Sequence, residues 1–384
     1  MKYYLIAGEP SGDSLGARLM EAIRRQDKDA FFAGIGGDGM QNQGLTSLFN
    51  ISELAVMGLA EVIPSIPRIL KRINQTVAEI ERLKPDVVIT IDSWSFCARI
   101  HKKLRKLNLN IPQVHYVAPQ VWAWKKKRAR TMHKYIDLLL TLFPYEPKYF
   151  LPYDLETVFV GHPVIENVNR RQIDTDAFKK QYNIPADNRI MLILPGSRHN
   201  EVERLLPDFL EVVKKMRAKH FDFSYVLPTV STVAERVKKA VAESELPITV
   251  IEGEDARRAA FQNAAVAVAA SGTVALELAI LDVPHIIAYK VPKLTEWVAR
   301  RCLHIQFVNL TNILLGYEVV PELLQQSCNP DNIMQYVEQF LSQNSLYKRQ
   351  IENFGKLRKL LGLNEQTPSD NAATAILELI NRRK

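Results

Sequence analysis

The sequence is poor in cysteine and shows no spacing typical of a metal centre. Its 384 residues include three cysteines, Cys97, Cys302 and Cys328, whose spacing is not that of metal ligands and whose odd number does not suit a disulfide framework. So few cysteines are typical of a reducing compartment. We therefore expect a cytoplasmic protein without structural disulfides. No other cluster of residues has metal-ligand spacing, so no metal or other cofactor is predicted.

Long uncharged apolar runs are also missing. The N-terminal stretch YYLIAG stops at Glu9, too early for a signal peptide. Residues 259–276 carry no charge, but polar residues at 262–263 and 271–273 interrupt them, and Glu277 follows at once. A buried strand, a turn and a helix start fit this segment better than a membrane span.

Short β-rich runs alternate with amphipathic helical patterns, such as residues 14–26, along most of the chain. This alternation favours parallel sheets with helices on both faces. The expected strands are residues 2–7, 30–35, 86–91, 112–117 and 136–142, and then 189–194, 223–227, 247–252, 265–270 and 284–289.

Because the pattern restarts after a polar stretch, we predict an α/β protein of two doubly wound, Rossmann-like domains that face each other across a cleft. The first spans residues 1–165 and the second 166–365, with a C-terminal helix at 366–384 packing back on the first. In this architecture ligands bind beyond the carboxyl ends of the strands.

Two glycine-rich segments follow the first strands. GIGGDG at 34–39 lacks the acidic residue that a dinucleotide site needs about 20 positions later, so a plain turn is favoured. GEPSGD at 8–13 enters a helix, where small residues let a ligand approach backbone amides. Ser11 or Asp13 could equally cap that helix.

Two turns of the second half suit phosphate. PGSR at 195–198 and SGTVALE at 271–277 each lead from a strand into a helix, whose free amides and dipole favour an anion. Arg198 adds a forked cation, and Glu277 could accept hydrogen bonds from a ribose, although local pairing is the alternative for both. The predicted site for a nucleoside diphosphate therefore includes Gly196, Ser197, Arg198, Ser271, Gly272, Thr273 and Glu277.

Asp92 ends a buried strand beside Ile91, Trp94 and Phe96. Apolar surroundings raise a carboxyl pKa and suit a general base, whereas capping of the next helix is the alternative. The histidines at 115 and 162 are interpreted as structural. DTD at 174–176 resembles an Asp-x-Asp metal motif, but its place before a helix favours capping.

The chain resembles the lipid-A-disaccharide synthases, inverting glycosyltransferases of the GT-B fold. The motifs that carry the resemblance are GEPSGDSLGA (8–17), GIGGDGM (34–40), LAVMGLAEV (54–62), VAPQVWAWKKKR (117–128), LPGSRHNEVE (194–203), ASGTVALE (270–277) and PELLQ (321–325). The resemblance implies transfer of 2,3-diacylglucosamine from UDP to the 6-hydroxyl of 2,3-diacylglucosamine 1-phosphate. The products are a β-1,6 disaccharide 1-phosphate and UDP.

The resemblance also implies roles for particular residues. Asp92 matches the essential aspartate, while Glu9, Arg198, Asn312 and the 271–277 turn match other active-site positions. Two departures stand out. Trp94 and Ser95 replace a Pro and a second Asp that usually follow Asp92, and Thr311 replaces a Pro before Asn312.

The stretch VWAWKKKRARTMHKY at 121–135 combines tryptophans with basic residues. We predict a cationic amphipathic helix at the membrane interface or beside the acceptor phosphate, with a packed helix that has a solvated basic face as the alternative. Nucleic acid is not expected, because no recognised nucleic-acid module accompanies the run. The predicted acceptor and membrane residues are Ser11, Asp13, Trp122, Trp124, Lys125, Lys126, Arg128 and Arg130.

Residues 54–70 add apolar surface for a lipid-facing patch or an acyl pocket. The expected location is therefore the cytoplasmic face of the inner membrane, with a homodimer left open. Two other functions remain open from the sequence. One is another GT-B enzyme that uses UDP-N-acetylglucosamine, either a lipid-linked transferase or a 2-epimerase, and the other is a non-enzymatic polyanion-binding protein.

Overall fold

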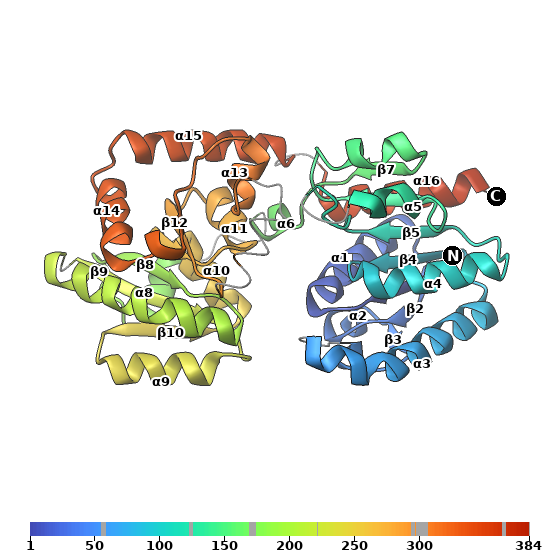
Figure 1. The fold of residues 1–384 in the computed structure, drawn as a ribbon, viewed down its shortest axis with the longest axis horizontal. Coiled ribbons are helices and arrows are strands. Elements are labelled where there is room, and N and C mark those ends of the chain that lie inside the picture. Colours follow the sequence, from blue (N-terminus) through green and yellow to red (C-terminus); the bar gives the residue numbers. More distant parts are fainter. Residues whose placement is uncertain are drawn as a thin grey trace. The chain divides into compact units, whose positions relative to one another are not determined.

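The computed structural model describes residues 1–54, 59–122, 126–168, 174–220, 222–292, 296, 306–362 and 366–383, without the side chains of 59–65, 126 and 167–168. The chain forms two compact units, residues 1–166 with 364–384, and residues 167–363 (Figure 1). Each unit has one parallel sheet with helices between successive strands. The predicted two-domain α/β fold is therefore confirmed.

The sheet of the first unit has the strand order β3-β2-β1-β4-β5-β6-β7. All its strand pairs are parallel. In chain order the strands are β1 (Lys2–Ala7), β2 (Phe31–Ile35), β3 (Thr46–Ser47), β4 (Val87–Ile91), β5 (Gln113–Tyr116), β6 (Leu138–Thr141) and β7 (Glu156–Phe159).

Alternate residues of the central strands direct apolar side chains to the helices on one face. Tyr4 and Ile6 of β1 and Val88 of β4 join a buried cluster with apolar residues of α3 and α4. Because both faces of a parallel sheet are covered, its central strands are mostly apolar. The helices of this unit are α1 (Pro10–Gln26), α2 (Asp38–Asn42), α3 (Leu59–Leu83), α4 (Trp94–Lys106), α5 (Ala129–Met132), α6 (Val164–Val168, at the boundary) and α16 (Pro368–Arg383), with 3₁₀ turns η1 (Ile51–Leu54), η2 (Lys126–Arg128), η3 (Pro147–Tyr149) and η4 (Leu151–Tyr153).

The C-terminal helix α16 belongs to the first unit and packs against α1. Glu166 fixes its start, because its carboxylate accepts the backbone amide of Ser369 at 2.7 Å and lies 3.6 Å from the Arg18 guanidinium. Arg25 and Asp370 add an ion pair at 2.6 Å. The end of the chain therefore completes the fold of the first unit.

The sheet of the second unit is also parallel throughout, in the order β10-β9-β8-β11-β12-β13. Apolar residues of α8 and α14 cover one face of its strands. The strands are β8 (Arg189–Leu194), β9 (Phe223–Thr229), β10 (Ile248–Glu252), β11 (Ala264–Ala269), β12 (His285–Tyr289) and β13 (Glu322–Leu324). The helices are α7 (Thr175–Gln181), α8 (His199–Lys219), α9 (Ala234–Ser244), α10 (Glu254–Gln262), α11 (Val274–Ile280), α13 (Leu310–Leu315), α14 (Pro330–Leu341) and α15 (Ser345–Leu360), with the 3₁₀ turn η5 (Gln325–Ser327).

The structure corrects the prediction for residues 121–135. Instead of one amphipathic helix, the described residues form a turn at 121–122, the 3₁₀ turn η2 and the four-residue helix α5. Val121, Ala129 and Met132 are buried in a small core with Phe150 and Leu155. These three described apolar residues therefore pack into the first unit, and the segment is not a continuous interfacial helix.

Candidate active site

Asp92 occupies a strained position at the carboxyl end of β4. Its φ is 54° and that of Ser93 is 42°, so both residues have left-handed backbone, which Asp tolerates better than most residues. The amide of Asp92 donates to Tyr116 O of the neighbouring strand at 2.9 Å, and this hydrogen bond holds the turn. Strain of this kind concentrates at functional sites.

The alternative that Asp92 caps the following helix is wrong. Ser93 is the N-cap residue of α4, and the Asp92 carboxylate accepts a hydrogen bond from the adjacent Ser93 amide at 2.7 Å rather than from the first turn of the helix. Burial raises the pKa of Asp92, the Ser93 amide lowers it, and the charge of Glu9 raises it further. The predicted upward shift is confirmed, and its direction favours proton acceptance.

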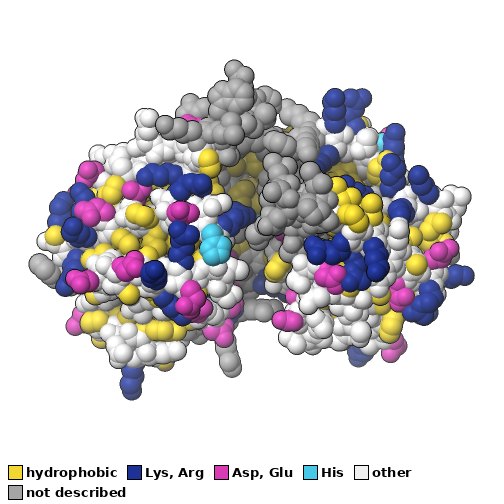
Figure 2. Space-filling view, turned by 60° about the horizontal axis from the view of Figure 1, so that its bottom comes forward, with side chains coloured by type: hydrophobic (Ala, Val, Ile, Leu, Met, Phe, Trp, Pro, Cys, Tyr) yellow, Lys and Arg dark blue, Asp and Glu magenta, His cyan; other side chains and the backbone are white. Residues whose placement is uncertain are grey.

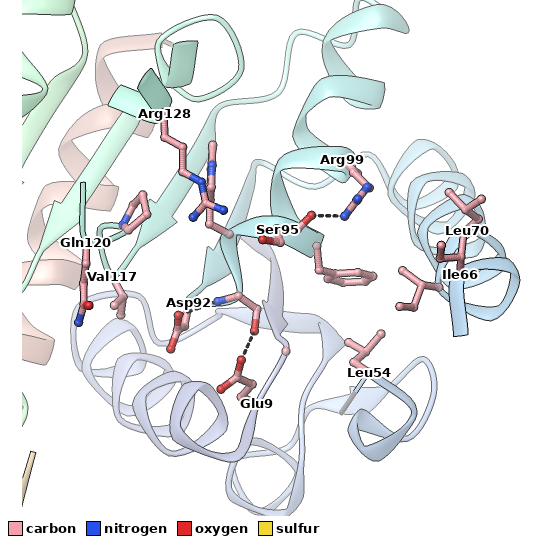
Figure 3. A pocket seen from close by; sticks show the side chains of 16 residues that line it. Glu9, Leu54, Ile66, Leu70, Asp92, Ser95, Arg99, Val117, Gln120 and Arg128 are labelled. Atoms are coloured by element: carbon pink, nitrogen blue, oxygen red, sulfur yellow. Dashed lines mark hydrogen bonds between the residues drawn. The ribbon is translucent and has the colours of Figure 1, made fainter. Parts of the chain in front are cut away.

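Glu9 joins the end of β1 to the end of β4. It is the exposed N-cap residue of α1, and its carboxylate accepts the Ser93 hydroxyl at 3.0 Å. Gly8 permits this approach, because a Cβ at that position would lie 2.6 Å from the Ser93 side chain. Two predicted acidic residues therefore meet at one edge of the sheet (Figure 3).

A pocket of about 770 Å³ lies over this edge, wholly within the first unit. Its volume is in the range that holds a small-molecule ligand. Polar side chains at Glu9, Asp92, Ser93, Arg99 and Arg128 share the lining with an apolar wall (Figure 3). The wall consists of Leu54, Ile66, Ile69, Leu70, Trp94 and Phe96.

The wall includes residues from both ends of the segment predicted to contact lipid. Leu54 ends η1, and Ile66, Ile69 and Leu70 lie on α3. Ile66 and Leu70 are each 45% exposed, a large fraction for aliphatic side chains beside a pocket.

The other predicted acceptor residues of the N-terminal motif do not line the pocket. Asp13 is buried, and its carboxylate accepts the amides of Gly37, Gly39 and Met40 at 2.7 to 3.0 Å. This correction has a structural reason, because Asp13 holds the GIGGDG turn and occupies the amides that a dinucleotide phosphate would need. Ser11 is exposed on the first turn of α1.

The basic segment contributes Arg128 to the pocket, while Arg130 is exposed. Trp122 packs edge-on against Tyr145, with ring centroids 5.8 Å apart, and is therefore a packing residue rather than an exposed interfacial one. Trp124 and Lys125 lie outside the described residues, as does the side chain of Lys126.

The histidines beneath the pocket are structural. His115 and His101 both hydrogen-bond the Thr90 hydroxyl, at 2.7 and 2.8 Å, and burial lowers the pKa of each. Burial also lowers the pKa of His162 to about 3, and its Nδ1 accepts the amide of Val164 at 3.1 Å. These rings are therefore neutral at physiological pH.

The two predicted phosphate turns of the second unit lie side by side. They follow β8 and β11, which are adjacent strands, and the Ala270 amide donates to Leu194 O at 2.8 Å. Among the predicted residues, the side chains exposed at these turns include Ser197, Arg198 and Thr273, while Ser271 is half-buried and donates to Val308 O at 3.2 Å. A Cβ at Gly272 would meet no atom within 4 Å, so that turn is open.

Sequence reasoning missed Glu201, which braces the first of these turns. Its buried carboxylate accepts the amides of Ser197 and Arg198 at 3.2 and 3.3 Å, the Arg198 guanidinium at 2.8 Å and the Tyr289 hydroxyl at 3.1 Å. The sequence held a signal for this role, because an acidic residue three positions after a helix N-cap typically turns back to bond the cap. The local pairing considered for Arg198 is therefore observed, although its side chain is 73% exposed.

Asn312 contradicts its prediction as a UDP-sugar contact. Its side chain is fully buried, with Oδ1 accepting the amides of Val319 and Val320 and Nδ2 donating to Val320 O and Glu322, all at 2.8 to 2.9 Å. An amide side chain has no further hydrogen-bonding capacity beyond these four bonds. Asn312 and Glu322 therefore hold the start of α13 in place.

Glu277 forms an ion pair with Arg257 at 2.5 Å, and Arg257 also bonds Glu254. Its proposed contact with a ribose stays a prediction. In the DTD segment, Asp174 accepts the amides of Asp176 and Ala177, so the interpretation as a helix cap is confirmed for Asp174. Within the described residues, no group of three potential metal ligands occurs, and no helix is long and apolar enough to cross a membrane.

Solved structures with a similar fold belong to one class of enzymes. The UDP-GlcNAc 2-epimerase of Neisseria meningitidis, solved with UDP-GlcNAc, matches all of this chain and all of its own with a TM-score of 0.67 at 13% identity. The MurG protein of Acinetobacter baumannii matches 99% of each chain with a TM-score of 0.54 at 14% identity. At such low identity the likeness shows the fold alone, which is the GT-B architecture of glycosyltransferases and related epimerases.

Sequence relatives make the assignment specific. The family model described as lipid-A-disaccharide synthetase matches residues 3–376. The lipid-A-disaccharide synthase of Paramagnetospirillum magneticum is 45% identical over all of this chain and 99% of its own, and that of Rhodospirillum centenum is 43% identical over 99% of this chain and 95% of its own. The chain therefore belongs to the lipid-A-disaccharide synthase family and is a glycosyltransferase, and the epimerase and polyanion-binding alternatives are not favoured.

Proposed function

We propose that the chain transfers 2,3-diacylglucosamine from UDP to the 6-hydroxyl of 2,3-diacylglucosamine 1-phosphate. The observation that carries the proposal is the pocket of the first unit, where an apolar wall adjoins a carboxylate of raised pKa. A simple sugar acceptor would need no such wall, whereas each buried methylene of an acyl chain stabilises binding by about 0.8 kcal/mol.

Asp92 serves as the general base. It accepts the proton of the acceptor 6-hydroxyl while that oxygen attacks C1 of the donor sugar from the face opposite UDP. The bond from C1 to the diphosphate oxygen breaks with both electrons, UDP leaves, and the configuration at C1 inverts to β. Glu9 accepts the hydroxyl of Ser93 and so holds the turn that carries Asp92, and the charge of Glu9 helps to raise the pKa of Asp92.

The second unit binds UDP in this proposal. The turns at Gly196–Arg198 and Ser271–Thr273 come from adjacent strands. The open turn at Ser271–Thr273 offers backbone amides to the diphosphate, and the turn at Gly196–Arg198 offers the exposed guanidinium of Arg198. Because these groups replace a divalent ion, we expect metal-independent catalysis. The proposed place of reaction is the cytoplasmic face of the inner membrane, where acylated substrates lie.

The test is direct synthesis. The purified chain, incubated with UDP-2,3-diacylglucosamine and 2,3-diacylglucosamine 1-phosphate, should release equal amounts of UDP and disaccharide 1-phosphate, with a β-1,6 linkage by NMR. Excess EDTA should leave the rate unchanged. Turnover of UDP-N-acetylglucosamine without a lipid acceptor would contradict the proposal, and loss of activity on chelation, restored by Mg²⁺, would contradict its metal-independent form.

A further inference from the structure

Two arginines border the pocket of the first unit. Arg99 lies on the second turn of α4, and Arg128 ends the 3₁₀ turn η2. Among the described residues neither forms an ion pair with a carboxylate, whereas Arg105, further along α4, pairs with Asp137 at 2.6 Å. The pocket therefore has two cations that are available to an anionic ligand.

The two arginines lie on different sides of the pocket. Figure 3 shows Arg128 on the side of Val117 and Gln120, toward which Asp92 also lies, and Arg99 beyond Ser95 on the side of Ile66 and Leu70. Arg99 stands five residues after the start of α4, which corresponds to about 8 Å along the helix axis. Arg99 is thus set back from the base and close to the apolar wall.

The guanidinium of Arg99 is oriented by a single contact. Its Nη1 donates to the backbone carbonyl of Ser95 one helical turn earlier. In the part of the chain that the structure describes, this is the one hydrogen bond of the side chain. Because an arginine carries five N–H donors in a planar fork, the others remain for a ligand such as phosphate.

The chemistry of the acceptor distinguishes between the two arginines. The 1-phosphate is on C1 and the 6-hydroxyl is on C6, which C5 carries on the other side of the ring oxygen, so the phosphate binds several bonds away from the oxygen that the general base activates. The acyl chains leave the ring from positions 2 and 3, nearer to the phosphate than to the 6-hydroxyl. A phosphate-binding cation should therefore lie away from Asp92 and beside the apolar wall, and Arg99 meets both conditions.

We propose that Arg99 binds the 1-phosphate of the acceptor and thereby determines which diacylated sugar enters the pocket of the first unit. This inference rests on the proposed function. An arginine that binds a phosphate through charge-assisted hydrogen bonds contributes a factor of about 10 to 100 in affinity. Acceptor selection is therefore a property of α4, separate from proton transfer at Asp92.

The experiment compares two acceptors in neutral detergent: diacylglucosamine 1-phosphate and its 1-O-methyl analogue. The wild-type chain should prefer the phosphate in kcat/KM by about 10- to 100-fold. In Arg99→Gln the acceptor KM for the phosphate should rise by that factor, the donor KM should stay unchanged, and the preference should vanish. Lys102→Gln is the matched control, an exposed cation on the same helix that does not line the pocket.

Several results would overturn the inference. One is an Arg99→Gln variant that melts like the control and keeps the preference for the phosphate. Another is loss of the preference in Arg128→Gln instead of Arg99→Gln. A third is an Arg99→Gln variant that loses binding to phosphatidylglycerol vesicles while its kinetics in neutral detergent stay normal, since that would assign the site to a lipid headgroup. A wild-type chain that makes no disaccharide would contradict the proposed function as well. This outcome differs from the three above, in all of which the wild-type chain is active.

Discussion

Asp92 and Glu201 both lie near the point where a parallel strand leads into a helix, one in each unit, yet their environments differ. The Asp92 carboxylate accepts one backbone amide, lies near a second acid and faces a pocket. The Glu201 carboxylate accepts two amides, a guanidinium and a phenol hydroxyl. Similar positions in similar units therefore hold one carboxylate ready to accept a proton and one that braces a turn.

The comparison separates polar residues that can react with or bind a ligand from polar residues that stabilise the fold. A buried polar group whose hydrogen bonds are all made within the chain stabilises the fold, and a ligand can reach it only at the cost of those bonds. Asn312 and Asp13 belong with Glu201 in this respect, whereas Asp92 retains capacity for a ligand proton.

The largest effect is expected from Asp92→Asn. The amide keeps the shape and tolerates left-handed backbone but cannot accept the acceptor proton, so kcat should fall about 10²- to 10⁴-fold. The melting temperature should not fall, because burial already disfavours the charged form of Asp92. Steady-state kinetics with both acylated substrates and calorimetric measurement of UDP binding check this.

Asp154→Asn is the matched control for that prediction, since Asp154 also has left-handed backbone, with φ of 56°, and does not line the pocket. Its kcat should equal that of the wild type. A kcat of Asp92→Asn within a few-fold of wild type would show that another group accepts the proton.

Asn312→Ala should have the second largest effect, on stability. It leaves the buried amides of Val319 and Val320 without their acceptor and removes a donor from Glu322. Each buried group left unsatisfied costs about 1–3 kcal/mol, so the free energy of unfolding should fall by roughly 2–4 kcal/mol in urea titrations. The folded fraction should still bind UDP.

Asn332→Ala provides the comparison, since that side-chain amide donates a single hydrogen bond, to Ser327 O at 3.0 Å. It should cost less than about 1 kcal/mol. If Asn312→Ala melted like Asn332→Ala and lost UDP affinity, Asn312 would be a ligand contact and its assignment to the scaffold would be wrong.

Much of the fold follows from periodicity. All ten predicted strands occur, because buried parallel strands are continuous apolar runs bounded by turns. The sequence did not reveal β3, β7 and β13, which have two, four and three residues and lie at the edges of their sheets. Edge strands are short and half covered, so they carry no comparable apolar pattern.

The candidate site could be predicted less completely. Asp92 stood out because a strand end and an apolar context are local features, whereas Glu9 followed from the family resemblance. Glu201 and Arg99 did not stand out in the sequence. Glu201 acts by turning back on the start of its own helix, and Arg99 lines a pocket whose apolar wall includes residues of α3. For 121–135, a helical wheel could not show that Val121 and Met132 pack into a tertiary core. Whether such residues line a site or pack into a core depends on tertiary contacts between segments that are distant in the sequence.

The third prediction extends the comparison to unpaired cations. Figure 2 shows Lys and Arg side chains next to an apolar area on the right-hand unit. Arg130 and Lys134 are exposed, and in the described residues neither is bound to a carboxylate, so they remain available for an anionic surface. Each cation near such a surface contributes about 1 kcal/mol. Replacing both by Gln should therefore lower binding to phosphatidylglycerol vesicles roughly 10- to 30-fold at low salt.

The effect should disappear at high salt, because screening removes it. Lys214→Gln/Lys239→Gln, two exposed cations of the second unit that face carboxylates on their own helices, is the control and should bind as wild type does. Unchanged vesicle binding in the Arg130/Lys134 variant at low salt would leave the apolar residues of α3 as the membrane contact.

The smallest effect concerns the pair that defines the site. The negative charge of Glu9 raises the pKa of Asp92, so Glu9→Gln should lower the pKa of Asp92. The base works when deprotonated, and kcat/KM falls as the pH drops through the pKa of Asp92. A lower pKa therefore moves the acid limb of the profile to lower pH.

Ser93→Ala is the control. It removes the hydroxyl that donates to Glu9 but keeps the charge of Glu9, so the acid limb of this variant should stay near that of the wild type. An acid limb that moves in Ser93→Ala but not in Glu9→Gln would assign the influence of Glu9 to the hydrogen bond and not to its charge.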